Sequence, residues 1–287
     1  MRWGGQRESS NIEDRRGMGP VGIGSGLGIG GVVLVLVVSF LTGTNPLVLL
    51  NMVETVQEGS SPVADSPGQT GAPKDELGRF AAVVLADTED TWTAVLPKLG
   101  HEYEEPRLVL FSGAVRSACG MGSSAVGPFY CPGDHKVYLD LSFFNELSRR
   151  FGAPGDFAQA YVIAHEVGHH VQNLMGIAER VTQLQRRASS GEANALSVRV
   201  ELQADCLAGV WGYHASRDRN IIEPGDFEDG LRAASAIGDD RLQRMSQGSV
   251  QPETWTHGSS EQRTTWLRRG LESGDPAACD TFAGSRL

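Results

Sequence analysis

Two histidines four residues apart constrain this chain more than any other feature of its sequence. His165 and His169 lie in a stretch whose apolar side chains recur at intervals of three and four. That period predicts a helix with one apolar stripe. Residues four apart leave the same face of a helix one turn from each other, so the two imidazoles can bind one ion. We expect the helix to begin at Asp156, with Gln159 as its capping-box partner, and to end at Gly176.

Glu166 stands directly after the first of these histidines. Its carboxylate then reaches a metal-bound water rather than the metal, which is the position of a general base. Gly168 adds to the case, because a glycine inside a helix costs about 1 kcal/mol relative to alanine and indicates the close approach of a backbone or a ligand. His170 points about 100° away around the helix, so we expect it to be structural. The alternative is two surface histidines on an amphipathic helix.

A zinc site needs a third protein ligand and an open fourth position. Glu201 and Asp205 are four residues apart in a stretch, residues 193–214, that we expect to be a largely buried helix. One carboxylate can bind the metal while the other accepts the N–H of a ligand histidine. Glu179 and Glu192 are competing ligands in polar stretches. The donor set suits one zinc ion, although cobalt or manganese can occupy the same ligands.

Charge and cysteine content limit the partners and the compartment. The chain has 25 Lys and Arg against 35 Asp and Glu, and its net charge of -10 argues against a nucleic-acid partner. Its four cysteines fit two disulfides. We expect Cys119 with Cys131 to close a loop between two strands, and Cys206 with Cys279 to tie the second helix to the C-terminal segment. Such disulfides are typical of an oxidising compartment.

An uncharged segment near the N-terminus predicts a membrane anchor. Residues 21–42 carry no charged side chain and are long enough to cross a bilayer core of about 30 Å as a helix. Four arginines precede this segment, and no basic residue follows it until Lys74, which predicts that residues 1–20 are cytoplasmic. A flexible linker, residues 43–75, would then lead to a folded domain, residues 76–287, on the non-cytoplasmic side of the cell membrane. A cleaved signal peptide is the alternative.

The remaining periodicity indicates an α+β fold class. We expect a mainly helical domain with a small sheet, preceded by one transmembrane helix. The expected strands are residues 107–115 and 136–141, and the other expected helices begin near residues 76, 142, 226 and 260.

Longer stretches around these residues resemble a known family. HEVGHH followed by ELQAD is similar to the glutamate-type zincins. With RESSNIEDRRG, GPFYCPGDHKVYLDL and THGSSEQR, these stretches resemble the neutral zinc metallopeptidase family (YpfJ-like) over nearly the whole chain outside the linker. The resemblance implies a zincin-like domain, with His165, His169 and Glu201 as zinc ligands, Glu166 as catalytic base and Asp205 as the residue that orients a ligand imidazole.

The resulting hypothesis is a membrane-anchored zinc endopeptidase that acts on a peptide or protein. For the donor that stabilises the oxyanion we choose His257, with Arg263 and Tyr213 as alternatives. Three other hypotheses compete: a zinc hydrolase of another amide such as a cell-wall peptide, a metal-stabilised adaptor without turnover, and a membrane interaction module. The sequence predicts no cleavage specificity and no oligomeric state.

Overall fold

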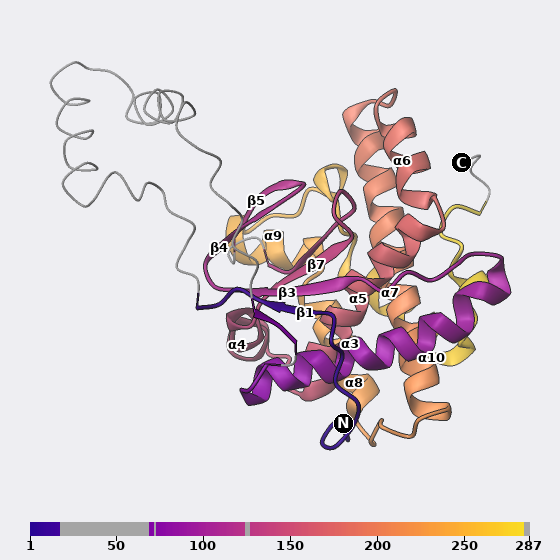
Figure 1. Ribbon diagram of the computed structural model, residues 1–287. Coiled ribbons are helices and arrows are strands. Elements are labelled where there is room, and N and C mark those ends of the chain that lie inside the picture. Colours follow the sequence, from indigo (N-terminus) through magenta and orange to yellow (C-terminus); the bar gives the residue numbers. More distant parts are fainter. Residues whose placement is uncertain (18–68, 72, 124–126, 284–287) are drawn as a thin grey trace, which may run out of the picture.

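The computed structural model describes residues 1–17, 69–71, 73–123 and 127–283. These residues form the expected mainly helical α+β fold with a small sheet (Figure 1). The predicted anchor, residues 21–42, and most of the predicted linker, residues 43–75, lie outside them. Within the described ranges, no helix is both long and apolar enough to cross a membrane.

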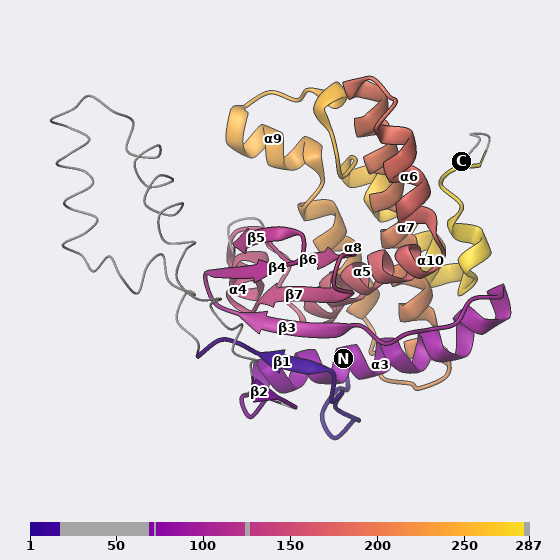
Figure 2. The ribbon, with the colours of Figure 1, turned by 45° about the horizontal axis from the view of Figure 1, so that its top comes forward.

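The main sheet has five strands in the order β2, β1, β3, β7, β6 (Figure 2). Strands β1, β3 and β7 are parallel, whereas β2 and β6 run antiparallel to their neighbours at the two edges. A separate hairpin consists of β4 and β5. The strand bounds are β1 Ile12–Asp14, β2 Gln69–Thr70, β3 Arg107–Phe111, β4 Ala114–Ser117, β5 Gly120–Ser123, β6 Phe129–Cys131 and β7 Lys136–Asp140.

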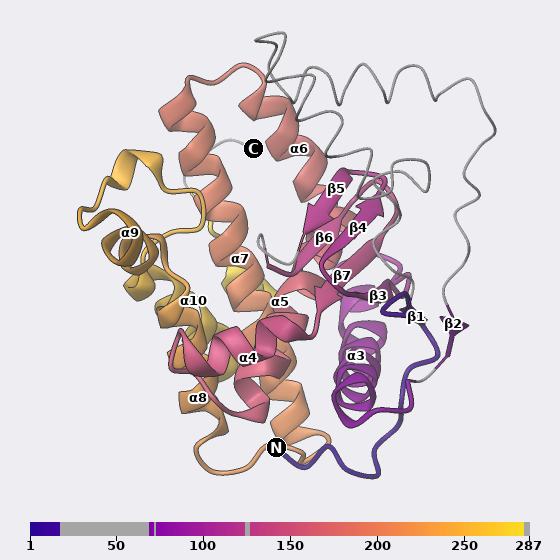
Figure 3. The same ribbon diagram turned by 90° about the vertical axis from the view of Figure 1, so that its left-hand side faces the viewer.

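Eight α-helices occur in the described residues. Their bounds are α3 Glu76–Val95, α4 Ser142–Arg149, α5 Asp156–Leu174, α6 Ile177–Gln185, α7 Ser190–Arg217, α8 Asp226–Ala236, α9 Asp239–Gln247 and α10 Ser260–Ser273. Helix α7 packs against both α5 and α10, and α5 also packs against α3 and α8 (Figure 3).

The core is divided between the two faces of the sheet. Successive residues of a strand point to opposite faces. Leu108 and Leu110 of β3 accordingly join the main core with the helices. Val109 and Phe111 belong to a smaller cluster that includes Val115 of the β4–β5 hairpin. The helices therefore gather on one face, and this is the face that positions the candidate site.

The central helix begins where the sequence predicts, but its cap differs. Asp156 is its first residue, Gly155 occupies the N-cap position, and no capping box with Gln159 forms. A capping box does occur at α7, where the side chains of Ser189 and Glu192 bond each other's backbone N–H groups. Glu192 thus serves a helix end and not the candidate metal site.

The N-terminal segment corrects the predicted domain division. We expected residues 1–20 to be separate from the folded domain, yet Ile12–Asp14 forms strand β1 inside the sheet. Glu13 is only 5% exposed and accepts a hydrogen bond from Lys136 Nζ at 3.0 Å. Upstream of the strand, Arg7 pairs with Glu89 of α3 at 2.9 Å. The strand was missed because it has only three residues and two of them are acids.

Both predicted disulfides are confirmed. Cys119 is bonded to Cys131, and Cys206 is bonded to Cys279. The second bond links the middle of α7 to the C-terminal end of the described chain, so it fixes the helix that carries the candidate carboxylates.

Candidate metal centre

Helices α5 and α7 approach closely at the point where the candidate residues meet. A Cβ atom on Gly168 would lie 3.0 Å from the carbonyl oxygen and 3.2 Å from the Cα atom of Ala204. A larger residue at position 168 would therefore push the two backbones apart. The predicted close approach at Gly168 is confirmed, and it places the histidines of α5 opposite the carboxylates of α7.

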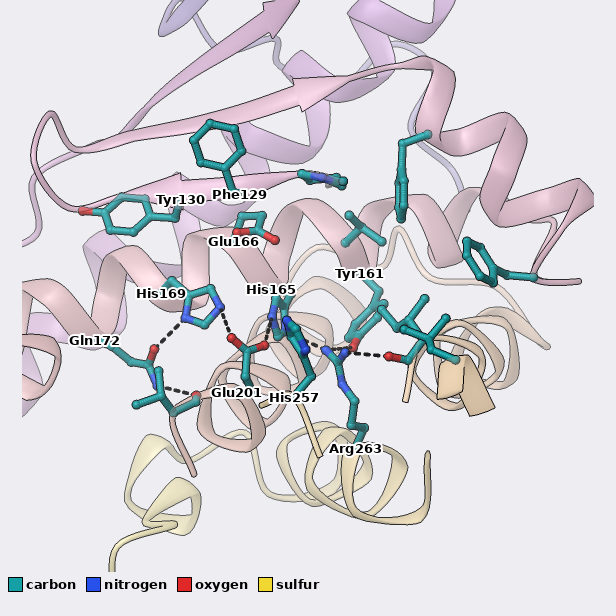
Figure 4. A pocket seen from close by; sticks show the side chains of 18 of the residues that line it. Phe129, Tyr130, Tyr161, His165, Glu166, His169, Gln172, Glu201, His257 and Arg263 are labelled. Atoms are coloured by element: carbon teal, nitrogen blue, oxygen red, sulfur yellow. Dashed lines mark hydrogen bonds and ion pairs between the residues drawn. The ribbon is translucent and has the colours of Figure 1, made fainter. Parts of the chain in front are cut away.

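Three side chains converge at this crossing. Glu201 Oε2 lies 3.2 Å from His165 Nε2, and Glu201 Oε1 lies 3.4 Å from His169 Nε2. One ligand atom from each of the three residues lies within 4.8 Å of the others. Figure 4 shows the Glu201 carboxylate facing both imidazoles. The structure thus selects Glu201, and not Glu179 or Glu192, as the carboxylate that faces the pair of histidines.

The chemistry and spacing of this donor set fit zinc. Two imidazole nitrogens and one carboxylate oxygen are typical ligands of a catalytic zinc ion. Ligand atoms about 2.1 Å from one tetrahedral ion lie roughly 3.4 Å from each other. The nitrogen–oxygen separations of 3.2 Å and 3.4 Å, each to a different oxygen of Glu201, are close to that edge length. Since one ligand atom from each residue lies within 4.8 Å of the others, the three side chains can converge on one ion.

The two neighbouring imidazoles stabilise the ionised form of Glu201. Burial by itself raises the pKa of Glu201, but the attraction of His169 and His165 outweighs it and lowers this pKa well below the usual value. Burial also opposes charge on His165, yet Asp205 and Glu201 together raise its pKa to about 10. Both nitrogens of that ring face carboxylate oxygens. Such surroundings favour a cation between His165 and Glu201, whether a proton or a metal ion.

Asp205 holds the far side of the His165 ring. Its Oδ1 atom lies 2.9 Å from His165 Nδ1, and Asp205 is fully buried. Arg263 donates to both carboxylate oxygens, from Nε at 2.8 Å and from Nη2 at 2.9 Å, and the hydroxyl of Tyr161 donates to Oδ1. Burial raises the pKa of Asp205, but Arg263 and His165 lower it to about 2. The imidazole orientation is therefore fixed by a buried, charged and fully bonded carboxylate.

The contacts of Arg263 and Tyr161 with Asp205 were not predicted from the sequence. Arg263 was considered only as a donor to the oxyanion, yet it is 3% exposed and its guanidinium is occupied by Asp205. A buried arginine is almost always paired, but nothing in the sequence marks Arg263 as buried. Tyr161 lies one turn before His165, and that spacing was the available signal.

A cavity of about 650 Å³ opens over the ligand cluster. Glu166, His257 and Arg263 line it together with the three clustered residues. Much of its remaining wall is apolar or aromatic and comes from several elements: Phe129, Tyr130, Phe143, Phe151, Val162 and Leu242. Strand β6, which supplies Phe129 and Tyr130, is an edge strand of the sheet. Residues of an edge strand therefore line the cavity.

Glu166 lies beside the ligand cluster without belonging to it. Its carboxylate reaches the cavity although the residue is only 8% exposed. Among the described residues, no side chain pairs with this carboxylate. Figure 4 shows Glu166 on the same helix as both histidines. Its oxygens are therefore available to a water or a substrate inside the cavity.

His257 reaches the same cavity from the loop before α10. Asp239 fixes this loop, because its Oδ2 atom accepts the backbone N–H groups of Thr256, His257 and Gly258 at 2.7–3.0 Å. Its Oδ1 atom lies 3.3 Å from His257 Nδ1. The hydrogen bond to Asp239 raises the pKa of His257 above its usual value. Asp239 is a further residue of the site that the sequence did not predict.

Two other predicted residues lie away from the ligands. The ring of Tyr213 packs against the ring of His214 and the guanidinium of Arg217, and Tyr213 does not line the cavity. His170 is fully buried, lies 3.0 Å from the Tyr130 hydroxyl and donates to the Glu104 carbonyl. The structural role expected for His170 is confirmed, and Tyr213 is the weakest of the three oxyanion candidates.

A helix with two histidines one turn apart, crossed by a second helix with an opposing carboxylate, is an arrangement that can hold one metal ion. The chain belongs to the family described as "putative neutral zinc metallopeptidase", whose model matches residues 1–282. That match includes the segment that forms β1. The expected family membership is confirmed.

The chain is similar to bacterial proteins along most of its length. It is 50% identical to the Escherichia coli K12 protein designated "Uncharacterized protein YpfJ", over 99% of this chain and all of that protein. It is 46% identical to "Uncharacterized protein Rv2575" of Mycobacterium tuberculosis H37Rv, over 76% of this chain and 75% of that protein. No solved structure matches the chain.

Proposed function

We propose that this protein is a zinc-dependent endopeptidase whose active site is the cavity over His165, His169 and Glu201. The observation that carries the proposal is the convergence of these three side chains beneath an accessible Glu166. A metal-stabilised adaptor would need the ligands but not a carboxylate in the cavity that has no side-chain partner among the described residues. That feature favours a catalyst over an adaptor.

Each side chain of the site has a separate role in hydrolysis. Zinc at this donor set would supply an activated water at neutral pH and a polarised substrate carbonyl. Glu166 accepts a proton from the attacking water and then delivers it to the leaving amine. His257 donates a hydrogen bond to the oxyanion that develops on the carbonyl. Asp205 holds His165 in place while Arg263 balances the charge of Asp205.

The substrate that fits this cavity best is an extended peptide. An extended chain can add to an exposed sheet edge by main-chain hydrogen bonds, and β6 presents such an edge beside the cavity. The apolar walls suit peptide side chains. A cell-wall amide remains the second candidate because the same ligands would hydrolyse it, but the described residues supply no observation that favours it.

We also propose that the enzyme works outside the cytoplasm. All four cysteines are paired in disulfides, and such bonds are rare in the cytosol. Residues 21–42 are the proposed membrane contact, on the basis of their uncharged sequence.

The proposal is tested by a substrate panel with the full-length, zinc-loaded protein and its Glu166→Gln variant. The panel contains unfolded proteins, defined peptides and cell-wall peptide fragments. We expect wild type to cleave internal peptide bonds, and Glu166→Gln to lose at least about 100-fold in kcat, since general acid–base catalysis contributes that much. Cleavage of wall fragments alone would move the assignment to the second candidate. Equal cleavage by both proteins would exclude Glu166 as the base.

A further inference from the structure

The second ligand histidine has a partner that is not a carboxylate. His169 Nδ1 lies 2.9 Å from Oε1 of Gln172, which follows it by three residues on α5. Gln172 is 1% exposed. Figure 4 shows this contact on the side of the imidazole away from Glu201. The two ligand histidines are therefore held by different chemistry, His165 by a buried anion and His169 by a neutral amide.

The orientation of the Gln172 amide is determined by its other contacts. Its Nε2 atom donates to the backbone oxygen of Val200 at 2.8 Å and to Oε1 of Gln203 at 3.0 Å. Both hydrogens of the amide nitrogen are thus directed at oxygen acceptors, so the amide oxygen must face His169. Gln203 is fixed in turn, because its Nε2 atom donates to the backbone oxygen of Cys279 at 3.1 Å. A run of buried amides thus reaches from the imidazole to the Cys206–Cys279 disulfide.

This polarity determines which nitrogen of His169 carries hydrogen. A carbonyl oxygen only accepts, so Nδ1 of His169 must be the donor. Its Nε2 atom, 3.4 Å from Glu201 Oε1, is then the nitrogen that offers a lone pair to an ion. Rotation of the Gln172 amide would turn a donor toward Nδ1 and would break two hydrogen bonds to α7.

We infer that Gln172 is a positioning residue of the metal site: its carbonyl oxygen selects the tautomer of His169 that binds the ion, and Gln203 holds that carbonyl in place. The inference rests on the proposed zinc site. Gln172 touches neither substrate nor the reacting atoms and acts only through His169. Gln172 thus does for His169 what Asp205 does for His165: it fixes the orientation of the imidazole.

The test compares zinc affinity in three full-length variants by competition with a chelator. Gln172→Met keeps the length of the side chain and removes its hydrogen bonds, and we expect the zinc Kd to rise about 10- to 100-fold, the usual effect of losing such a partner. Gln203→Met leaves the bond to His169 intact but loosens its support, so a smaller rise is expected. Asn173→Ala is the matched control, because Asn173 is the next residue of α5 and contacts Tyr130 and His135 instead. Its Kd should equal that of wild type.

Proton NMR of the zinc-loaded protein gives a second readout that a merely structural role would not change. Wild type should show an exchange-protected Nδ1–H resonance from His169, and Gln172→Met should lose it. A Kd within twofold of wild type in Gln172→Met, or a protected Nε2–H in place of Nδ1–H, would overturn the inference. If Gln172→Met fails to fold, an unchanged Kd in Gln203→Met would overturn it as well. Zinc binding without any cleavage would contradict the proposed function but not this inference. A wild-type protein that binds no zinc would contradict both.

Discussion

At the scale of single residues, the protonation of His257 beside Asp239 can be tested through the pH dependence of activity. His257 lines the cavity, and its side chain is 51% exposed, so its proton can exchange with solvent. Asp239 raises the pKa of His257, and the protonated imidazole is the stronger donor to an oxyanion. Activity that depends on this proton is retained below the pKa and lost as the pH rises through it.

We predict that Asp239→Asn moves the alkaline limb of the kcat/KM profile to lower pH, because it removes the charge that raises the pKa of His257. His257→Ala should lower kcat by about 10²- to 10³-fold at the optimum, the typical loss of one oxyanion donor. Initial rates on one peptide across the pH range measure both effects. An unchanged alkaline limb in Asp239→Asn would assign that limb to another group.

Single residues also show which parts of the site the sequence predicts. The two histidines and Glu166 follow from spacing alone, because positions on one helix have a known geometry. Glu201 was one of several candidate carboxylates by spacing, and the family resemblance implied it as the ligand; the crossing of α5 and α7 places it opposite the histidines. Gln172 was overlooked because an amide on a helix carries no signal of its own. Its role depends on the backbone of another helix.

At the scale of elements, α7 and α10 pack so closely that glycine is required between them. A Cβ atom on Gly270 would overlap the carbonyl oxygen of Cys206 and lie 2.7 Å from the backbone nitrogen of Val210. Both atoms belong to the backbone of α7, so neither can move without shifting the helix. This contact brings Arg263 of α10 to Asp205 of α7.

We predict that Gly270→Ala lowers the free energy of unfolding by about 1–3 kcal/mol or more, the usual cost of overpacking a core. Gly191→Ala is the matched control, since Gly191 lies in α7 with open space around it. That substitution should be neutral or slightly stabilising because alanine favours helix. Thermal unfolding of the two variants and wild type compares them. Equal midpoints for Gly270→Ala and wild type would contradict the close packing of α7 and α10.

The elements also separate into those that pattern predicts and those that it does not. Long periodic helices such as α3, α5, α7 and α10 were predicted near their observed bounds. Helices α6 and α9 were missed because their sequences are polar and nine residues long. The predicted strand at residues 107–115 is in fact two strands, β3 and β4, which belong to different sheets. Gly113 lies between them with a positive φ, which turns the chain.

At the scale of the whole molecule, β1 joins the N-terminal segment to the rest of the folded domain. It pairs with β2 and β3, and its neighbouring residues contact α3. A truncated chain that begins at Glu76 would lack β1 and β2 and would expose the edge of β3. Assays therefore require the full chain.

We predict that residues 1–17 and residues 73–283 lie on the same side of any membrane that the protein contacts. Single cysteines at Gln6 and Glu272, both exposed, should react equally with a membrane-impermeant maleimide in intact cells and after lysis. The native cysteines are all in disulfides and provide a low background. Labelling of one position in intact cells and of the other only after lysis would contradict this prediction. That result would support the topology expected from the sequence, with the two segments on opposite sides.

The most direct test of the metal centre is the zinc content of full-length wild type, Glu166→Gln and Glu201→Gln at one fixed free zinc concentration. We predict about one zinc ion per chain in wild type and in Glu166→Gln, because Glu166 is the base and not a ligand. Glu201→Gln should bind zinc at least about 100-fold more weakly, since it loses an anionic ligand from the set with His165 and His169. Equal zinc in Glu201→Gln and wild type, or none in wild type, would contradict this account.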